Sequence, residues 1–287
     1  MSASIDLHTH STASDGSLAP EELVRRAAAA GVEVLALTDH DTTAGVAAAA
    51  EAAAALGLVL VPGVEISVTW GGRTIHIIGL GVDAENPRLR QGLERLVDYR
   101  HWRAEEIARR LAAEGIDGAH AGAAAFAQGR SIGRTHFARF LVSRGHAADL
   151  RGVFKRFLVR GKPGHVPGDW ASLEEAVGWV RAAGGQAVIA HPARYDLTRV
   201  KLNRLVGELK EAGGVGIEVV SGSHSREDVL NFGRYAREQG LLASAGSDYH
   251  GPEAVWLELG RLPPLPAGCT PIWADWPELR QRRQAYG

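Results

Sequence analysis

The sequence predicts an α/β fold, a βα barrel interrupted by a block of helices, and three observations support this prediction. Short apolar runs of strand length alternate with helix-length segments through residues 1–85. The same alternation resumes at about residue 166, whereas the stretch between the two regions is almost entirely helical in pattern. Strands that alternate with helices are typical of parallel βα units, and six or seven such units suffice for a barrel, which need not be regular.

The first part of the barrel, residues 1–85, is expected to combine five strands with two helices. The strands are expected at 4–9, 34–38, 59–64, 66–70 and 74–80, and the helices at 20–30 and 43–56. Pro20 suits the first turn of the earlier helix, and Gly31 ends it. The pair Gly71 and Gly72 predicts a hairpin turn between the last two strands.

Residues 86–165 are expected to form a helical insertion domain. Leucine, valine and isoleucine recur with a helical period at 93, 96, 97, 107 and 111, and shorter helices are expected at 121–126, 135–143 and 149–156. Residues 161–170 are rich in proline and glycine, so they are expected to form a linker back to the barrel.

The second part of the barrel is expected to span residues 166–287. Its strands are expected at 187–190, 216–220 and 242–246, and its helices at 172–183, around 202–209, and at 225–239. The proline-rich segment 263–271 is expected to wrap the surface.

Composition excludes several classes of protein. Hydrophobic residues make up 45% and charged residues 23% of the 287 residues, which is typical of a soluble globular chain rather than a disordered one. The net charge of −1 indicates neither a membrane surface nor a DNA duplex as a partner, and no apolar run reaches the roughly 20 residues that span a bilayer. The single Cys269 excludes an internal disulfide, and no signal peptide is visible, so a cytoplasmic location is expected.

Ionisable side chains gather at or near the ends of the predicted strands. They are His8, His10, Asp15, His40, Glu65, His76, His191, Asp248 and His250. Residues at i and i+2 of a strand point to the same face, so His8 and His10 can hold one ion. Glu65 follows an apolar run, where a carboxylate must be paired or bind a cation. Because the active site of a βα barrel lies at the carboxyl ends of its strands, the set predicts a metal centre.

The insertion is strongly basic for a chain of nearly zero net charge. From residue 130 to residue 162 it carries nine Lys or Arg residues and one acid, a local charge of +8. A solvated helix face explains most of these residues, but some can bind phosphate at the barrel rim. The candidates are Arg134 and Lys162, which follow glycines in turns, and then Arg194 and His224 on rim loops.

The ordered motifs also carry a resemblance. The stretches 6–11, 14–16, 38–41, 191–192 and 248–250 (DLHTHS, SDG, TDHD, HP and DYH) resemble those of the polymerase and histidinol phosphatase (PHP) family. The resemblance covers residues 5–85 and about 166–250, and it implies a distorted seven-stranded barrel with three metal ions. Within the family, the insertion and the stretch 131–136 are most similar to a bacterial branch that acts on nucleotides. That branch includes phosphatases of nucleoside 3′,5′-bisphosphates and 5′-to-3′ exoribonucleases.

The resemblance assigns the candidate ligands to three divalent ions. His8, His10, Glu65 and Asp248 would hold the first; Glu65, His76 and His191 the second; and Asp15, His40 and His250 the third. Mixed imidazole and carboxylate ligands suit manganese, iron or zinc, of which manganese is the expected ion.

The expected activity is that of a metal-dependent phosphoesterase. Its substrate would be a nucleoside 3′,5′-bisphosphate such as adenosine 3′,5′-bisphosphate, which loses its 3′-phosphate to a metal-bound hydroxide and leaves the 5′-monophosphate. Asp248 is counted among the catalytic residues, and His224 is the candidate that protonates the leaving oxygen. Three alternatives stay open: a 5′-to-3′ exoribonuclease on short 5′-phosphorylated RNA, a histidinol-phosphate phosphatase, and a metal-binding scaffold without activity.

Overall fold

A computed structural model describes residues 4–129, 131–253 and 257–277 of the chain. Seven strands form one sheet in sequence order: β1 (Ile5–Asp6), β2 (Val34–Leu37), β3 (Val59–Trp70), β4 (Arg73–Leu80), β5 (Gln186–Ile189), β6 (Gly216–Ser221) and β7 (Leu242–Gly246). The neighbours pair in parallel, except that β4 runs antiparallel to both β3 and β5. The backbone N–H of Leu7 donates to the carbonyl of Ala245 at 2.9 Å, which brings the first and last strands together. The prediction of a distorted seven-stranded α/β barrel is confirmed.

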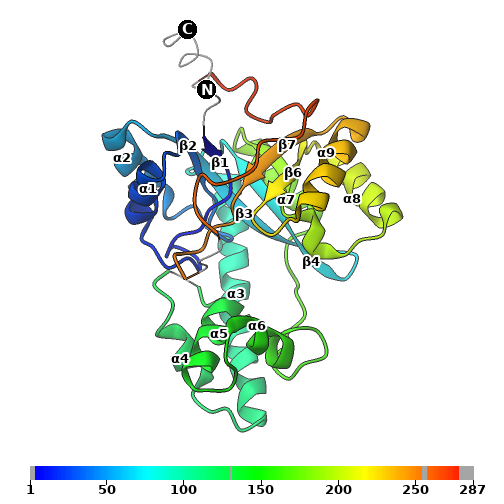
Figure 1. Cartoon of the computed structure of the whole chain (residues 1–287). Helices are drawn as coiled ribbons and strands as arrows, with labels where there is room; N and C mark the ends of the chain where they lie inside the picture. Colours follow the sequence, from blue (N-terminus) through cyan, green and yellow to red (C-terminus); the bar gives the residue numbers. More distant parts are fainter. Residues whose placement is uncertain (1–3, 130, 254–256, 278–287) are drawn as a thin grey trace.

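Some helices cover the outside of the barrel, and the helices of the insertion extend away from it. They are α1 (Pro20–Ala29), α2 (Val46–Leu56), α3 (Pro87–Ala113), α4 (Ala119–Ala124), α5 (Arg134–Ser143), α6 (Leu150–Val153), α7 (Leu173–Ala182), α8 (Arg199–Ala212) and α9 (Arg226–Gln239), with a π-helical turn η1 (Phe154–Leu158) and a 3₁₀ turn η2 (Pro192–Tyr195). Figure 1 shows α1 and α2 on one side of the barrel and α7, α8 and α9 on the other. Within the described residues, no helix is both long enough and apolar enough to cross a membrane.

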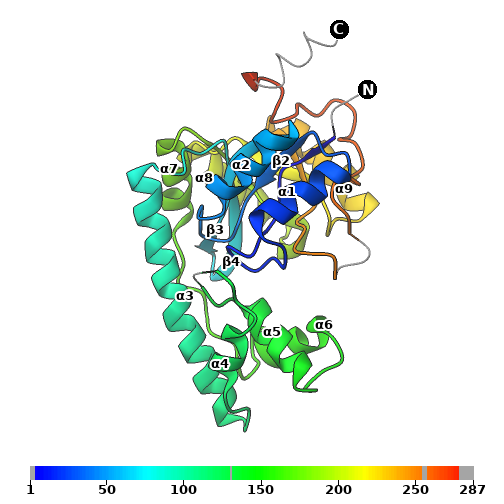
Figure 2. The same ribbon diagram turned by 90° about the vertical axis from the view of Figure 1, so that its left-hand side faces the viewer.

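The long helix α3 links two hydrophobic cores. Its first half places Leu89 and Leu93 in the core between the sheet and α7, and its second half places Ile107 and Leu111 in a separate core with α5. Figure 2 shows α3 running along one side of the molecule, with α4, α5 and α6 gathered beneath the barrel. The helices α4, α5 and α6 therefore lie next to one end of the barrel.

Two strands differ from the sequence prediction. Residues 59–64 and 66–70 form one continuous strand, because the register with β4 runs unbroken from Gly63 to Trp70 and pairs Glu65 with Ile78. The first strand is only two residues long, and Thr9 returns to the sheet as an isolated bridge to Tyr249. Both departures occur beside ionisable side chains: the ladder of β3 continues through Glu65, whereas the strand β1 ends before His8.

Candidate metal centre

The structure brings together side chains from six of the seven strands or the loops that directly follow them. His8 and His10 follow β1, His40 follows β2, and Asp248 and His250 follow β7. Glu65 and His76 lie within β3 and β4, Asp15 in the loop after β1, and His191 just after β5. His40 forms an isolated parallel bridge with Glu65, which places the end of β2 directly beside the middle of β3.

One group of four side chains is fully or almost fully buried. Its members are His8, His10, Glu65 and Asp248, whose candidate ligand atoms lie within 4.8 Å of one another. Nε2 of His8 and Nε2 of His10 each lie 3.3 Å from Oε2 of Glu65. Nε2 of His10 also lies 3.2 Å from Oδ1 of Asp248. The four donors therefore face a common point, as the ligands of one ion do.

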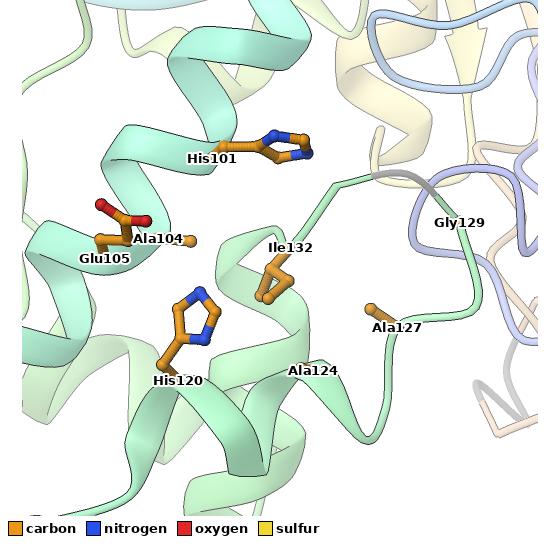
Figure 3. A pocket seen from close by; sticks show the side chains of 8 residues that line it. All are labelled: His101, Ala104, Glu105, His120, Ala124, Ala127, Gly129 and Ile132. Carbon is orange, nitrogen blue, oxygen red and sulfur yellow. The ribbon is translucent and has the colours of Figure 1, made fainter.

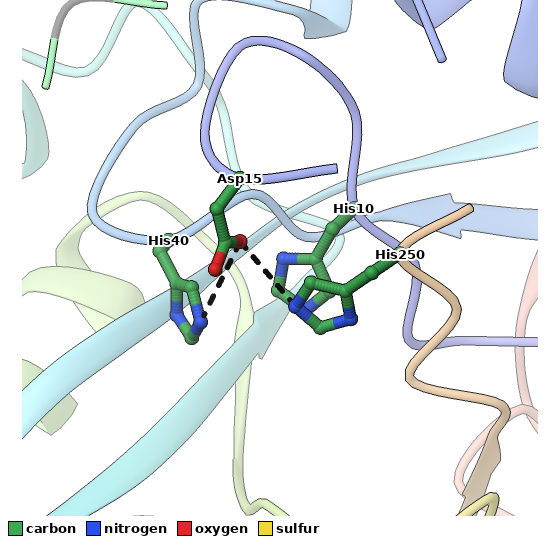
Figure 4. Close-up of side chains that lie close together, drawn as sticks. All are labelled: His10, Asp15, His40 and His250. Atoms are coloured by element: carbon green, nitrogen blue, oxygen red, sulfur yellow. Dashed lines mark ion pairs between the residues drawn. The ribbon is translucent and has the colours of Figure 1, made fainter. Parts of the chain in front are cut away.

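A second group shares His10 and adds Asp15, His40 and His250 (Figure 4). Oδ1 of Asp15 lies 3.3 Å from Nε2 of His250 and 3.9 Å from Nε2 of His40. The rings of His10 and His250 stack with their centroids 4.1 Å apart. The aspartate thus lies between two imidazoles that reach it from different loops.

A third group centres on Glu65. It contains His40, Glu65 and His76, and His191 contacts the same carboxylate. Oε1 of Glu65 lies 2.8 Å from Nδ1 of His76 and 2.8 Å from Nε2 of His191, while Oε2 lies 2.9 Å from Nδ1 of His40. The carboxylate of Glu65 therefore has imidazoles at both of its oxygens.

The donor atoms of these groups fit divalent metals. Several are buried and have no hydrogen-bond partner among the described residues, although buried polar atoms in proteins are nearly always paired. They include Nε2 of His8 and of His10, Oε2 of Glu65 and Oδ1 of Asp15. Buried imidazole nitrogens and carboxylate oxygens that converge without partners are what manganese, iron or zinc would satisfy.

The surroundings of the centre shift the pKa values of its donors in both directions. Burial alone would lower the pKa of His10, but contacts with the carboxylates of Asp248 and Glu65 raise it to about 10. Burial would raise the pKa of Asp15, but the nearby charges of His250 and His40 hold it well below its ordinary value. Burial lowers the pKa of His40 to about 4, against the opposing effect of Glu65. An ionised carboxylate and a neutral imidazole are the states that coordinate a cation, so an ion held by His10 would have to displace its proton.

The backbone at two candidate ligands is in the left-handed region that residues other than glycine rarely adopt. His191 has a φ of 25° and Asp248 a φ of 59°. Such conformations cost of order 1–3 kcal/mol each and are concentrated at functional sites. The amide of Asp248 donates to the carbonyl of His8 at 2.8 Å, which helps to hold this conformation.

Three residues outside the predicted set of site residues contact the candidate ligands or the loops that carry them. Glu218 contacts His8 and the backbone of His191, and the hydroxyl of Thr135 donates to Oδ2 of Asp15 at 2.8 Å. Asp39 accepts hydrogen bonds from Ser11 and Ser14, which shape the loop that leads to Asp15. One signal was available, because Glu218 is a lone acid in an otherwise apolar strand.

The four candidate substrate-binding residues have different surroundings. Arg194 contacts Oδ2 of Asp248, so its charge is directed at a candidate ligand. Arg134 begins α5 with its guanidinium 5.7 Å from the centre of the Phe154 ring. Lys162 is exposed in the chain after η1.

His224 has a defined orientation. Its Nδ1 lies 3.0 Å from the carbonyl oxygen of Val219, its ring stacks on Phe232, and its buried Nε2 has no partner among the described residues. Because a carbonyl only accepts, Nδ1 carries the proton, and Nε2 is the atom left to exchange one.

A pocket lies apart from the metal centre, between α3, α4 and the segment before α5 (Figure 3). It has a volume of about 430 Å³, and residues such as His101, Glu105, His120 and Ile132 line it. None of the nine candidate ligands belongs to its lining.

Known proteins resemble this chain along nearly its whole length. A model of the PHP domain family matches residues 6–186. A 3′,5′-nucleoside bisphosphate phosphatase of Chromobacterium violaceum is 50% identical over 274 residues, covering 95% of this chain and 96% of that protein. A 5′-3′ exoribonuclease of Escherichia coli is 46% identical over 273 residues, covering 94% and 93%.

Two solved structures are also similar to this chain over nearly its whole length. An amidohydrolase from Chromobacterium violaceum with bound sulfate has a TM-score of 0.92 and 49% identity, covering 98% of this chain and 97% of its own. A putative metal-dependent phosphoesterase from Bifidobacterium adolescentis has a TM-score of 0.78 and 27% identity, covering 96% and 94%.

Proposed function

The chain belongs to the PHP domain family, and we propose that it is a metal-dependent phosphatase that removes the 3′-phosphate of nucleoside 3′,5′-bisphosphates. The observation that carries the proposal is the convergence of buried imidazoles and carboxylates with unpartnered donor atoms at one end of the barrel. The 50% identity to a bisphosphate phosphatase, over 95% of the chain, supports the choice of substrate.

We assign three divalent ions to the centre, with manganese as the expected metal and iron or zinc as alternatives. The first would be held by His8, His10, Glu65 and Asp248, the second by Glu65, His76 and His191, and the third by Asp15, His40 and His250. The central position of Glu65, with imidazoles at both of its oxygens, supports its role as a bridge.

The residues of the chain have distinct roles in the proposed reaction. When bound, the metals would supply an activated water for attack on phosphorus and offset the negative charge of the phosphoryl oxygens. Arg134 would bind the second phosphate, since a guanidinium presents paired donors that match phosphate oxygens. His224 would move a proton through Nε2 to the leaving oxygen, because its Nδ1 is committed to the carbonyl of Val219.

An exoribonuclease acting on short 5′-phosphorylated RNA is the second candidate. The 46% identity to an exoribonuclease over 94% of the chain favours it, and so does the basic insertion, which could hold further phosphates of an RNA chain. The same metal centre would serve both reactions, since each is the hydrolysis of a phosphate ester.

Product analysis by mass spectrometry separates these candidates. The purified, manganese-loaded protein is incubated with adenosine 3′,5′-bisphosphate and, separately, with a 5′-phosphorylated RNA trinucleotide. We expect rapid loss of the 3′-phosphate from the bisphosphate. Stepwise release of 5′-mononucleotides with no turnover of the bisphosphate would replace the phosphatase proposal with the exoribonuclease. The absence of product from either substrate would reject the assignment to nucleotides.

A further inference from the structure

The carboxylate of Glu218, which is none of the nine candidate ligands, contacts two of them at once. We propose that Glu218 is a positioning residue that couples the first and second metal sites by holding His8 and His191 together. The inference rests on the proposed function, since it concerns how the ligands of those two sites are oriented. Glu218 lies in β6 and is completely buried.

The first contact orients His8. Oε1 of Glu218 lies 2.9 Å from Nδ1 of His8, and both side chains are fully buried. A carboxylate oxygen accepts hydrogen bonds, so Nδ1 of His8 donates to Glu218 and Nε2 is the nitrogen left to bind an ion. Nε2 is the atom 3.3 Å from Glu65 and 3.5 Å from Asp248. A carboxylate behind an imidazole fixes its tautomer and ring plane in this way at many metal sites.

The second contact holds the backbone of His191. The amide N–H of His191 donates to Oε2 of Glu218 at 2.6 Å. His191 has φ 25° and ψ 60°, a conformation that its own backbone does not favour. The charge-assisted hydrogen bond offsets part of that cost, and it directs Nε2 of His191 to Oε1 of Glu65 at 2.8 Å.

The neighbouring strand leaves space for this arrangement. A Cβ at Gly246 of β7 would lie 2.2 Å from Cβ of His8 and 2.9 Å from Oε1 of Glu218. Any side chain there would therefore push the histidine and the carboxylate apart. The pairing of β6 with β7 shifts register between Glu218 and Val220, immediately after the acid.

The two oxygens of Glu218 thus contact ligands of the first and second proposed sites, whereas Thr135 contacts a ligand of the third. Thr135 donates its hydroxyl to Oδ2 of Asp15 and leaves Oδ1 directed toward His250. If Glu218 acts by positioning, its loss weakens the first two sites and spares the third. A purely structural role would instead lower the stability of the whole protein and weaken all three sites alike.

The test measures manganese binding by isothermal titration calorimetry on metal-free protein, together with metal content after dialysis. Glu218→Gln keeps the shape of the side chain, but its NH₂ group opposes one of the two N–H donors and its neutral oxygen is a weaker acceptor for the other. We expect the affinity for two of the three bound ions to fall by roughly 10- to 100-fold. Thr135→Val should weaken one ion only. The matched control is Ser244→Ala, because Ser244 is the buried residue of β7 that pairs directly with Glu218 of β6, and its hydroxyl has no partner among the described residues.

Each outcome decides the proposal. Unchanged manganese affinities in Glu218→Gln would overturn it while leaving the proposed function in place. If the wild-type protein binds no manganese, the proposed function fails, and the positioning role fails with it. A second measurement needs no variant: nitrogen-15 NMR of the protein loaded with zinc, which is diamagnetic, should show His8 with its proton on Nδ1. A proton on Nε2 would contradict the proposal even if Glu218→Gln does not fold.

Discussion

Glu65 contacts more of the candidate ligands than any other residue that the structure describes. Its two oxygens lie within 3.3 Å of five imidazoles, those of His8, His10, His40, His76 and His191. Burial would raise the pKa of this carboxyl group, but the imidazoles around it hold the pKa well below its ordinary value. The charge of Glu65 is therefore available as a ligand over the physiological pH range.

Replacing that charge should stop the reaction. We expect Glu65→Gln to lower kcat/KM for adenosine 3′,5′-bisphosphate by more than about tenfold, equal to at least about 1.4 kcal/mol of lost transition-state stabilisation. The side chain keeps its size, so circular dichroism should show an intact fold. Glu85→Gln is the control, because Glu85 is exposed and pairs only with Arg90 among the described residues. Turnover within tenfold of the wild type would show that Glu65 is not a metal ligand.

Arg134 tests the binding of the second phosphate. No carboxylate is in hydrogen-bond contact with its guanidinium among the described residues, and burial lowers its pKa. A hydrogen bond to a charged group contributes about 1.5–3 kcal/mol, so Arg134→Ala should raise KM for the bisphosphate by roughly 10- to 100-fold. The KM for a nucleoside 3′-monophosphate should change little. Arg144→Ala, at the other end of α5, serves as control, and an equal effect on both substrates would contradict the role of Arg134.

How much of the site the sequence predicts depends on where each residue lies along the chain. Ligand candidates such as His8 and Asp248 could be found because they end apolar strands, and a barrel gathers strand ends at one rim. Glu218, Thr135 and Arg100 could not be placed in this way. Their roles depend on contacts between segments that lie far apart in sequence, such as the 120 residues between Thr135 and Asp15.

At the scale of elements, a buried ion pair adds to the apolar packing that joins α3 to the barrel. Arg100 lies within 2.7 Å of Asp41, which follows β2, and donates to the hydroxyl of Ser67 at 3.0 Å. Its guanidinium also lies 5.1 Å from the centre of the Trp170 ring. Asp41 has a φ of 55° and directly follows His40, so the ion pair holds both the helix and the loop that carries a candidate ligand.

Breaking this pair should destabilise the fold strongly. Arg100→Met leaves the carboxylate of Asp41 buried without its partner, which typically costs about 3–5 kcal/mol. Urea unfolding of the metal-free protein should show this loss. Adding Asp41→Asn should recover part of it, because asparagine removes the charge and tolerates a positive φ. If the double variant were no more stable than Arg100→Met alone, the buried charge would not be the cause.

The elements themselves were easier to predict than their limits. A helical period predicted helix across most of the insertion, and it extends unbroken through the 27 residues of α3. The predicted break between two strands at Glu65 was wrong. A sequence pattern alone places an acidic residue at the end of a strand, because it does not show the partners that would let the acid be buried within one. In the fold those partners are the imidazoles of neighbouring strands, so β3 continues through the site.

At the scale of the whole molecule, the chain returns to the barrel after the insertion. The sequence predicts domains at 1–85, 86–165 and 166–287, and this division stays a prediction. The helix α3 packs its first half on the barrel and its second half in the core of the insertion, so it belongs to both parts. Thr135 and Arg139 of α5 contact Asp15 across the same boundary. The insertion therefore contributes directly to the geometry of the third proposed site.

Metal binding should stabilise the whole fold against unfolding, because the ligands come from segments up to about 240 residues apart, such as His8 and Asp248. The unfolded chain cannot present them together, so the ions bind the native state alone and stabilise it. At a free concentration 100 times the Kd, each ion adds about 2.7 kcal/mol. For a chain of this size that corresponds to roughly 4–5 °C in Tm per ion. Differential scanning calorimetry should therefore show a marked fall in Tm when a chelator removes manganese, with recovery on readdition. Calcium, which prefers oxygen ligands, should restore much less. A Tm that is indifferent to the chelator would mean that these buried imidazoles and carboxylates are not a metal centre.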